Sequence, residues 1–358
     1  MSAQPDAFFP SDYATARSRF RSAARAAGAA LDALTLDARG PRGEDLTIDV
    51  ARVGGRAARR VLLHTCGLHG VEAFAGAAVQ LAALARPSAV PDGCALVLVH
   101  VLNPYGMAWL RRTNENNVDL NRNFLDPGEP RQGAPALYSR LDRLLNPPGA
   151  PGPDGFRLRL AVAALRHGPR ALTQAIAEGQ YEFPRGLFYG GGALERGPGL
   201  YLDWLRRNLS QAEYVFALDL HTGLGPRGKE TLILEAGGGA TPAAQLARAL
   251  GRPLVDPSAA QAGYRIRGGM GRALQQTLTG ARLDFVLQEI GTRSRLAVLE
   301  ALREENRWHH HGGAGPEHSS KQALREALNP ASPKWRRRAL DRGLALLRAA
   351  AAWTFERQ

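Results

Sequence analysis

Residues 60–102 read RVLLHTCGLHGVEAFAGAAVQLAALARPSAVPDGCALVLVHVL and establish the architecture of the chain. Short aliphatic runs at Arg60–Thr65 and Cys94–Leu102 are typical of buried strands. Between them, Val71–Ala85 is rich in Ala and Leu and holds no helix breaker except Gly76, which predicts a helix. A strand, a helix and a second strand in this order form a βαβ unit, so the two strands should be parallel.

The alternation of strands and helices continues on both sides of this unit. Further strands are predicted at Leu46–Val53, Tyr214–Leu220, Thr231–Glu235 and Asp284–Gln288, and further helices at Gly199–Leu209, Thr241–Leu250 and Gly271–Leu278. The sequence therefore predicts an α/β fold, a three-layer sandwich in which helices cover both faces of a mixed, mostly parallel sheet.

A long connection runs from Leu125 to Gly197 and is interrupted by a Pro/Gly-rich stretch at Pro147–Asp154. Apolar residues at helical spacing predict helices at Ala136–Leu145 and Arg157–Ala177 within it. A connection of this length is either a lid over a site or a plain insertion.

Amphipathic helices are expected near both ends of the chain, at residues 14–36 and 338–355. No internal repeat and no shift in composition separates two cores. Residues 1–358 are therefore predicted to form one domain, whose motif-bearing core spans residues 45–305 and on which the two terminal helices pack.

Composition argues for a globular protein and against a nucleic-acid-binding one. The 358 residues are 44% hydrophobic and 22% charged, enough for a large core. The 46 Lys and Arg exceed the 33 Asp and Glu, which gives a formal net charge of +13. Almost all of this excess is arginine scattered along the chain, whereas nucleic-acid-binding surfaces cluster their cations. We expect no nucleic-acid partner.

Cys66 and Cys94 are the only cysteines, too few for a disulfide framework or a four-thiolate metal site. Residues 1–17 contain acids and prolines and no apolar run of signal length. No stretch approaches the roughly 18 uninterrupted apolar residues of a membrane span. We expect a soluble, cytoplasmic protein without a membrane partner. The sequence does not predict the oligomeric state.

His69 and Glu72 lie three residues apart where the first strand of the βαβ unit turns into its helix. In such a turn an imidazole and a carboxylate can approach one point, as two metal ligands must. Alternatively, Glu72 is an acid in the first turn that complements the helix dipole. The pair alone does not decide between these interpretations.

A second histidine, His221, follows Asp219 and Leu220 at the end of the predicted strand Tyr214–Leu220. Ligands gather at the carboxyl ends of strands in open α/β sheets. Two imidazoles and one carboxylate would leave a fourth position for water, the arrangement of a catalytic zinc. The alternative is a structural histidine bonded to Asp219 or to a loop carbonyl.

Three further segments carry a resemblance to a known family. They are Asn103-Pro104-Tyr105-Gly106, Asp119-Leu120-Asn121-Arg122-Asn123 and the strand that ends at Glu289. Together with His69, Glu72 and His221, this set resembles the zinc carboxypeptidase superfamily over residues 61–292, and within it the DUF2817 proteins. The Asp219-Leu220-His221 sequence is similar to the aspartoacylase and succinylglutamate desuccinylase branch.

The resemblance implies a role for each matching residue. His69, Glu72 and His221 would bind one Zn²⁺ per chain, and Asp119 would accept a hydrogen bond from His69. Glu289 would be the general base that takes a proton from water.

The resemblance also implies substrate-binding residues. Asn121 and Arg122 would hold a substrate carboxylate, and Tyr264 is a weaker candidate for a mobile tyrosine near the site, with a packed tyrosine as the alternative. An arginine would stabilise the oxyanion of the reaction. Counting back from Asp119 selects Arg112, whereas the spacing from Trp109 selects Arg111, so both remain candidates.

Other segments that contain histidines or glycines have ordinary interpretations. The run His309–His311 is interpreted as a solvated loop, and Phe188–Gly192 as a turn. His64 and His100 lie in predicted strands and should be core residues or neighbours of the ligands.

These features favour a zinc-dependent hydrolase that cleaves an amide in a small substrate with a free carboxylate. Both a peptide, as in carboxypeptidases, and an N-acyl amino acid, as in deacylases, would suit the same residues. The alternative is a catalytically silent binding module of the same fold that uses arginines to hold an acidic ligand.

Overall fold

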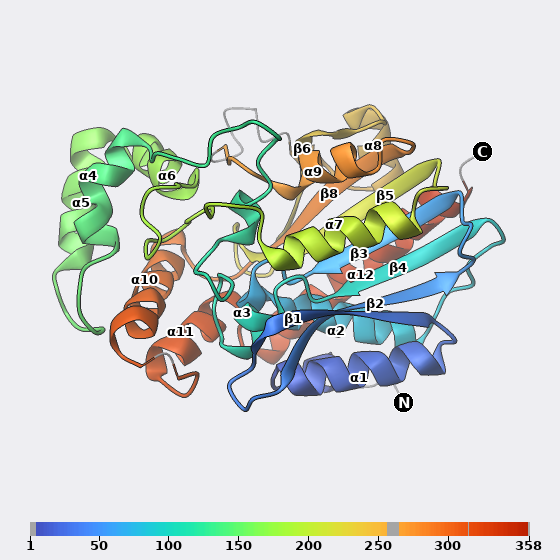
Figure 1. Cartoon of the computed structure of the whole chain (residues 1–358), viewed down its shortest axis with the longest axis horizontal. Helices are drawn as coiled ribbons and strands as arrows, with labels where there is room; N and C mark the ends of the chain where they lie inside the picture. Colours follow the sequence, from blue (N-terminus) through green and yellow to red (C-terminus); the bar gives the residue numbers. More distant parts are fainter. Residues whose placement is uncertain (1–4, 256–264, 314, 357–358) are drawn as a thin grey trace.

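The computed structural model describes residues 5–255, 265–313 and 315–356. Within these residues, eight strands form one sheet in the order β1-β2-β4-β3-β5-β8-β6-β7 (Figure 1). The strands are β1 (Ala30–Arg39), β2 (Asp45–Gly54), β3 (Arg60–Cys66), β4 (Cys94–His100), β5 (Tyr214–Gly223), β6 (Glu230–Gly239), β7 (Leu254–Val255) and β8 (Arg282–Gly291).

The central strands β4, β3, β5 and β8 are all parallel to one another. Antiparallel pairs β1–β2 and β2–β4 extend the sheet on one side, and β6 pairs antiparallel with β8 on the other. The predicted mixed, mostly parallel sheet is confirmed, and so is the βαβ unit formed by β3, α2 (Ala73–Ala85) and β4.

Helices cover both faces of the sheet. Apolar residues of α7 (Arg196–Asn208) and α9 (Met270–Thr277) pack with those of the strands on one face. On the other face lie α1 (Tyr13–Ala26), α2, α8 (Ala243–Leu250) and α12 (Pro333–Glu356). The three-layer arrangement follows because strands buried on both faces need an apolar helix surface on each side.

A group of helices stands beyond one end of the central strands, at the left of Figure 1. It comprises α4 (Ala136–Leu145), α5 (Phe156–His167), α6 (Pro169–Ala177), α10 (Arg295–His311) and α11 (Ser319–Leu328). Val71, just after β3, packs with Leu302 of α10 and Leu324 of α11. These helices therefore sit at the carboxyl ends of the parallel strands. Shorter helical turns are η1 (Pro5–Phe8), η2 (Gly70–Glu72), α3 (Pro104–Ala108) and η3 (Leu120–Arg122).

The predicted helix at residues 14–36 is wrong in its second half. The helix α1 ends at Ala26, Gly28 adopts a positive φ of 70°, and the edge strand β1 follows. Leu34 and Leu36 alternate with exposed residues and pack against the sheet core. This alternation has the period of a strand, but the Ala-rich sequence beside it favours a helix and makes the alternation hard to recognise. The predicted C-terminal helix is confirmed and extends over α12.

Two other expectations are corrected. Gly168, with φ of 81°, and Pro169 divide the predicted helix Arg157–Ala177 into α5 and α6. His309–His311 form the last turn of α10 and not a solvated loop. The charged residues that precede them face the interior, so the run continues a helix that is buried on one side.

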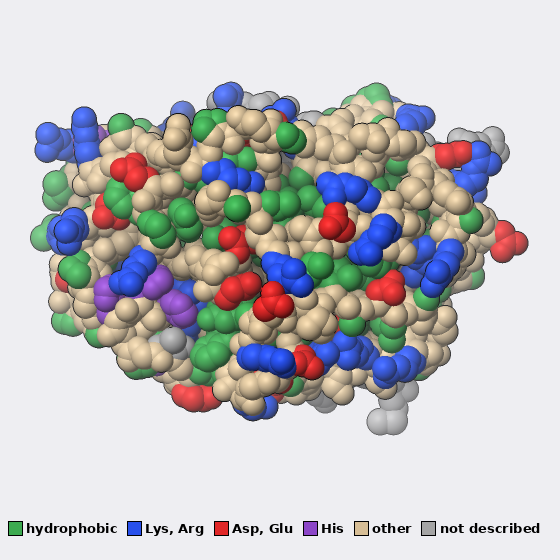
Figure 2. Space-filling model, in the orientation of Figure 1, with side chains coloured by type: hydrophobic (Ala, Val, Ile, Leu, Met, Phe, Trp, Pro, Cys, Tyr) green, Lys and Arg blue, Asp and Glu red, His purple; other side chains and the backbone are tan. Residues whose placement is uncertain are grey.

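Basic and acidic side chains are interspersed on the face drawn in Figure 2, which holds no continuous basic patch among its described residues. Within the described ranges, no helix is both long enough and apolar enough to cross a membrane. The single-domain organisation stays a prediction.

Candidate metal centre

His69, Glu72 and His221 are brought together by two neighbouring parallel strands. His69 follows β3 and Glu72 lies in η2, whereas His221 lies near the carboxyl end of β5. The turn between β3 and η2 depends on Gly67, whose φ is 72° and where a Cβ would lie 2.8 Å from a side-chain carbon of Val101. The ends of parallel strands meet at one edge of a sheet, so the three side chains converge there.

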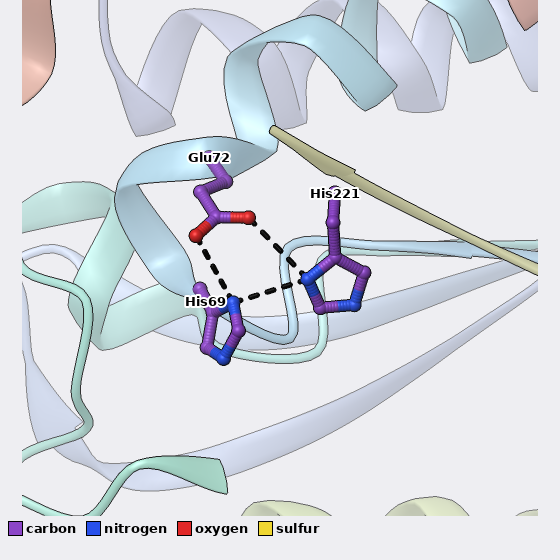
Figure 3. A group of neighbouring side chains, drawn as sticks. All are labelled: His69, Glu72 and His221. Carbon is purple, nitrogen blue, oxygen red and sulfur yellow. Dashed lines mark hydrogen bonds and ion pairs between the residues drawn. The ribbon is translucent and has the colours of Figure 1, made fainter. Parts of the chain in front are cut away.

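The donor atoms of these three side chains face one another, as Figure 3 shows. His69 Nδ1 is 3.0 Å from Glu72 Oε1, and His221 Nδ1 is 3.3 Å from Glu72 Oε2. The two Nδ1 atoms are 3.1 Å apart. Ligands placed tetrahedrally at 2.0–2.1 Å from a zinc ion are about 3.3 Å from one another. The spacing of the three donors therefore fits a single small cation, and the triad could hold a metal.

Each histidine is oriented by a buried carboxylate on its other ring nitrogen. His69 Nε2 lies 3.1 Å from Asp119 Oδ1, and His221 Nε2 lies 2.6 Å from Asp219 Oδ2. A proton held at Nε2 by a carboxylate leaves the Nδ1 lone pair free to bind a cation. The donor set thus has the chemistry of a metal centre.

Charge around the triad is balanced by buried groups of opposite sign. Burial alone would raise the pKa of Glu72, but His69, His221 and Arg112 outweigh it and lower that pKa. Burial also opposes ionisation of Asp119, yet Arg112, Arg122 and His69 hold its pKa well below the usual range. Both carboxylates are therefore ionised at neutral pH, as metal ligation and imidazole orientation require.

Arg112 contacts the triad directly. Its Nη1 donates to Glu72 Oε1 at 3.0 Å and its Nε to Asp119 Oδ2 at 3.0 Å. Its Nη2 lies 2.7 Å from His69 Nε2. That nitrogen accepts from Arg112 in one tautomer and donates to Asp119 in the other, so only one of the two hydrogen bonds forms at a time. Arg112 also lines the cavity described below.

Arg111 points away from this cavity. Its side chain is fully buried, and its Nε donates to Glu305 Oε1 at 2.9 Å. Its Nη2 donates to Asn117 and Asn306, at 2.8 and 3.2 Å. Of the two arginines left open by the sequence, Arg112 is the one beside the triad, and its role in stabilising an oxyanion stays a prediction.

Glu289 lies on β8, directly beside β5, which carries His221. The register pairs His221 with Glu289, and both Glu289 and Glu72 line the same cavity. The backbone N–H of Leu224 donates weakly to Glu289 Oε2 at 3.4 Å. Burial raises the pKa of Glu289 to about 8, although the charge of the nearby His221 acts in the opposite direction and lowers this pKa. A carboxyl with a pKa near neutrality is suited to accept and return a proton.

The cavity beside the triad has a volume of about 820 Å³ and contains the predicted substrate-binding residues Asn121 and Arg122 on its wall. Arg122 Nε and Nη2 donate to the carbonyl of Ala177, and Nη1 donates to that of Asn121. Asn121 Oδ1 has no hydrogen-bond partner among the described residues. Carboxylate binding by this pair stays a prediction, and Tyr264 lies outside the described residues.

Sequence reasoning missed several residues of this site. Phe188 places its ring 5.5 Å from the guanidinium carbon of Arg112 and 5.8 Å from that of Arg122. The turn interpretation of Phe188–Gly192 gave no sign of this contact. Four further arginines also line the cavity: Arg265, Arg267, Arg272 and Arg295. They occur among many scattered arginines, so no local pattern marks them.

The fold is carboxypeptidase-like. It is similar to bovine thrombin-activatable fibrinolysis inhibitor in complex with tick carboxypeptidase inhibitor, with a TM-score of 0.54, 11% identity and coverage of 96% of this chain and 97% of that one. A second structure of thrombin-activatable fibrinolysis inhibitor gives a TM-score of 0.52 and 11% identity, over 97% and 75% of the two chains. Carboxypeptidase A from Helicoverpa armigera matches with a TM-score of 0.49 and 14% identity, over 95% and 73%.

The chain belongs to the DUF2817 family, described as a protein of unknown function, whose model matches residues 9–342. The comparison with curated proteins found no match. The expected membership of this family and the expected carboxypeptidase-like fold are confirmed.

Proposed function

We propose that this protein is a zinc-dependent hydrolase that cleaves an amide bond in a substrate with a free carboxylate. The observation that carries the proposal is the convergence of the His69, Glu72 and His221 donors within 4.8 Å of one another, beside a large cavity that His69 and Glu72 line. The metallocarboxypeptidase-like fold and the two histidine-orienting carboxylates support it.

A zinc ion, when bound, supplies Lewis acidity and lowers the pKa of a water molecule to near 7. Glu289 would take a proton from a water molecule in the cavity as the oxygen of that water adds to the amide carbonyl carbon. Arg112 donates N–H bonds to the carbonyl oxygen as negative charge develops there. The C–N bond breaks, and Glu289 returns the proton to the leaving nitrogen, so the products are a carboxylic acid and an amine.

Substitution Glu289→Gln separates catalysis from metal binding. We expect zinc content near one equivalent in both proteins and turnover of N-acyl amino acids, short peptides or muropeptide fragments only in the wild type. Glu213→Gln is a matched control, because Glu213 is an exposed acid paired with Arg59 at the opposite end of β5. Equal turnover in wild type and Glu289→Gln would contradict the proposed base. A protein that binds zinc and acidic ligands but turns over none of these substrates would favour a binding module.

A further inference from the structure

The wall of the cavity farthest from the sheet is apolar and is built by helices outside the three layers. Residues of α5 and α6 form one side: Leu160, Leu172 and Ile176. Residues of α10 form the facing side: Leu296, Val298, Leu299 and Leu302. Leu172, Ile176 and Leu299 also belong to one apolar cluster, so these helices pack together around the space they enclose.

Several of these side chains remain partly uncovered. Leu296 is 40% exposed, and Leu160, Val298 and Leu299 are half-buried. Apolar side chains left open on a concave wall mark a surface that binds another apolar group. The cavity volume of about 820 Å³ is large enough for an elongated ligand. A substrate whose acyl part is only an acetyl group would leave most of this apolar wall exposed to water.

The same cavity carries cationic groups beside the apolar wall. Arg267 pairs with Glu129 at 3.2 Å, and Arg272 pairs with Asp126 at 2.7 Å. Among the described residues, the guanidinium groups of Arg265 and Arg295 take part in no ion pair. An apolar wall next to these cationic groups complements an amphiphile with an anionic group.

We propose that the substrate carries a medium-length or long acyl chain that lies between α6 and α10, so that the amide it cleaves is a fatty-acyl amide of an anionic compound. This inference rests on the proposed function for the cleavage step, but the acyl-binding wall exists independently of the metal. Each methylene buried against the wall should strengthen binding about threefold to fourfold.

Straight-chain carboxylates test the wall without turnover. Butyrate, hexanoate, octanoate and decanoate are titrated into the full-length protein, with and without zinc, by calorimetry. We expect the affinity to rise at least a hundredfold from butyrate to decanoate. An affinity that does not depend on chain length would overturn the inference.

Paired variants locate the binding site. Leu160→Gln combined with Leu296→Gln should reduce the preference for decanoate over butyrate at least tenfold, because both side chains line the cavity. The control combines Leu158→Gln with Leu165→Gln on α5, whose side chains are 72% and 88% exposed and do not line the cavity. Equal losses in the two pairs would refute the site. Thermal unfolding verifies that all variants are folded.

The outcomes also separate this inference from the proposed function. Chain-length-dependent binding by a protein that holds no zinc would support the acyl-binding wall and contradict the hydrolase. Zinc-dependent hydrolysis of N-acetyl and N-decanoyl amino acids at the same kcat/KM would support the hydrolase and contradict the wall.

Discussion

His221 and Glu289 are register partners on the neighbouring parallel strands β5 and β8. Residues in register on adjacent strands project to the same side of a sheet. A candidate metal ligand and the candidate proton acceptor are therefore positioned by the backbone hydrogen bonds of two central strands and not by a loop. The chemistry proposed here needs this fixed relationship, because the water that gives up its proton must lie next to both.

Removing the carboxylate behind a ligand histidine should weaken metal binding without abolishing it. Asp219→Asn replaces the acceptor 2.6 Å from His221 Nε2, and we expect zinc affinity to fall about 10- to 100-fold. Competition with a chromophoric chelator measures this change. Thr65→Val is the control, because Thr65 Oγ1 donates to the other oxygen of Asp219 at 2.7 Å and this variant keeps the carboxylate oxygen that faces His221. Unchanged affinity in Asp219→Asn would show that the carboxylate does not orient the imidazole.

Loss of the guanidinium beside the triad should slow turnover and leave the metal in place. Arg112→Ala should reduce kcat about 10²- to 10³-fold, the usual cost of removing one oxyanion-stabilising donor. Zinc content, measured by mass spectrometry, should stay near one equivalent, since Arg112 is not a ligand. A lower zinc content with unchanged kcat per bound zinc would assign Arg112 to metal binding instead.

Glu305 is the single acid in a buried group that also contains Arg111 and Lys321. We expect its negative charge to stabilise the folded protein. Glu305 Oε1 accepts from Arg111 Nε at 2.9 Å and from Lys321 Nζ at 2.6 Å. Glu305→Gln leaves two buried cations without a counter-charge, so we expect a loss of about 3–5 kcal/mol in the free energy of unfolding. Lys321→Met keeps the Arg111–Glu305 pair and should cost less. Urea denaturation compares the unfolding free energies of the two variants. A larger loss in Lys321→Met than in Glu305→Gln would contradict this account.

Acid should destabilise the protein through two buried histidines of the strands β3 and β4. Burial lowers the pKa of His64 to about 4 and that of His100 to about 3, below the value of 6.5 in an unfolded chain. Between these values the unfolded chain binds more protons, so stability falls as the pH drops below 6.5. At pH 5 each of these histidines should lower the free energy of unfolding by about 2 kcal/mol.

Urea denaturation of wild type and His100→Asn at pH 7 and pH 5 tests this prediction. The variant has one buried imidazole fewer, so its unfolding free energy should fall less on acidification. An equal fall in both proteins would show that His100 is not held neutral in the folded state.

The site could be predicted from sequence where strand ends position the residues. His69 and His221 each follow a short apolar strand, and the carboxyl ends of parallel strands meet, so their convergence required no knowledge of the loops. The βαβ unit was equally clear, because Val71–Ala85 has no helix breaker other than Gly76.

The parts of the fold and the site that the sequence does not predict depend on contacts between distant segments. Such contacts leave no pattern in the local sequence. Glu305 lies 194 residues from Arg111 in the sequence, so nothing near Arg111 indicated that its guanidinium is committed to a buried acid. The predicted helix at residues 14–36 includes residues 30–36 of β1, where tertiary pairing with β2 overrides the propensity of an Ala- and Leu-rich segment. The apolar cavity wall arises only when α10 meets α5 and α6.

Zinc stoichiometry tests the central claim most directly. Purified protein is loaded with zinc, freed of excess metal and measured by mass spectrometry beside His69→Ala and His221→Ala. We expect close to one equivalent of zinc in the wild type and a large loss in both variants, with circular dichroism showing that all three are folded. A folded wild-type protein that retains no divalent metal, or variants that retain as much as the wild type, would contradict the account.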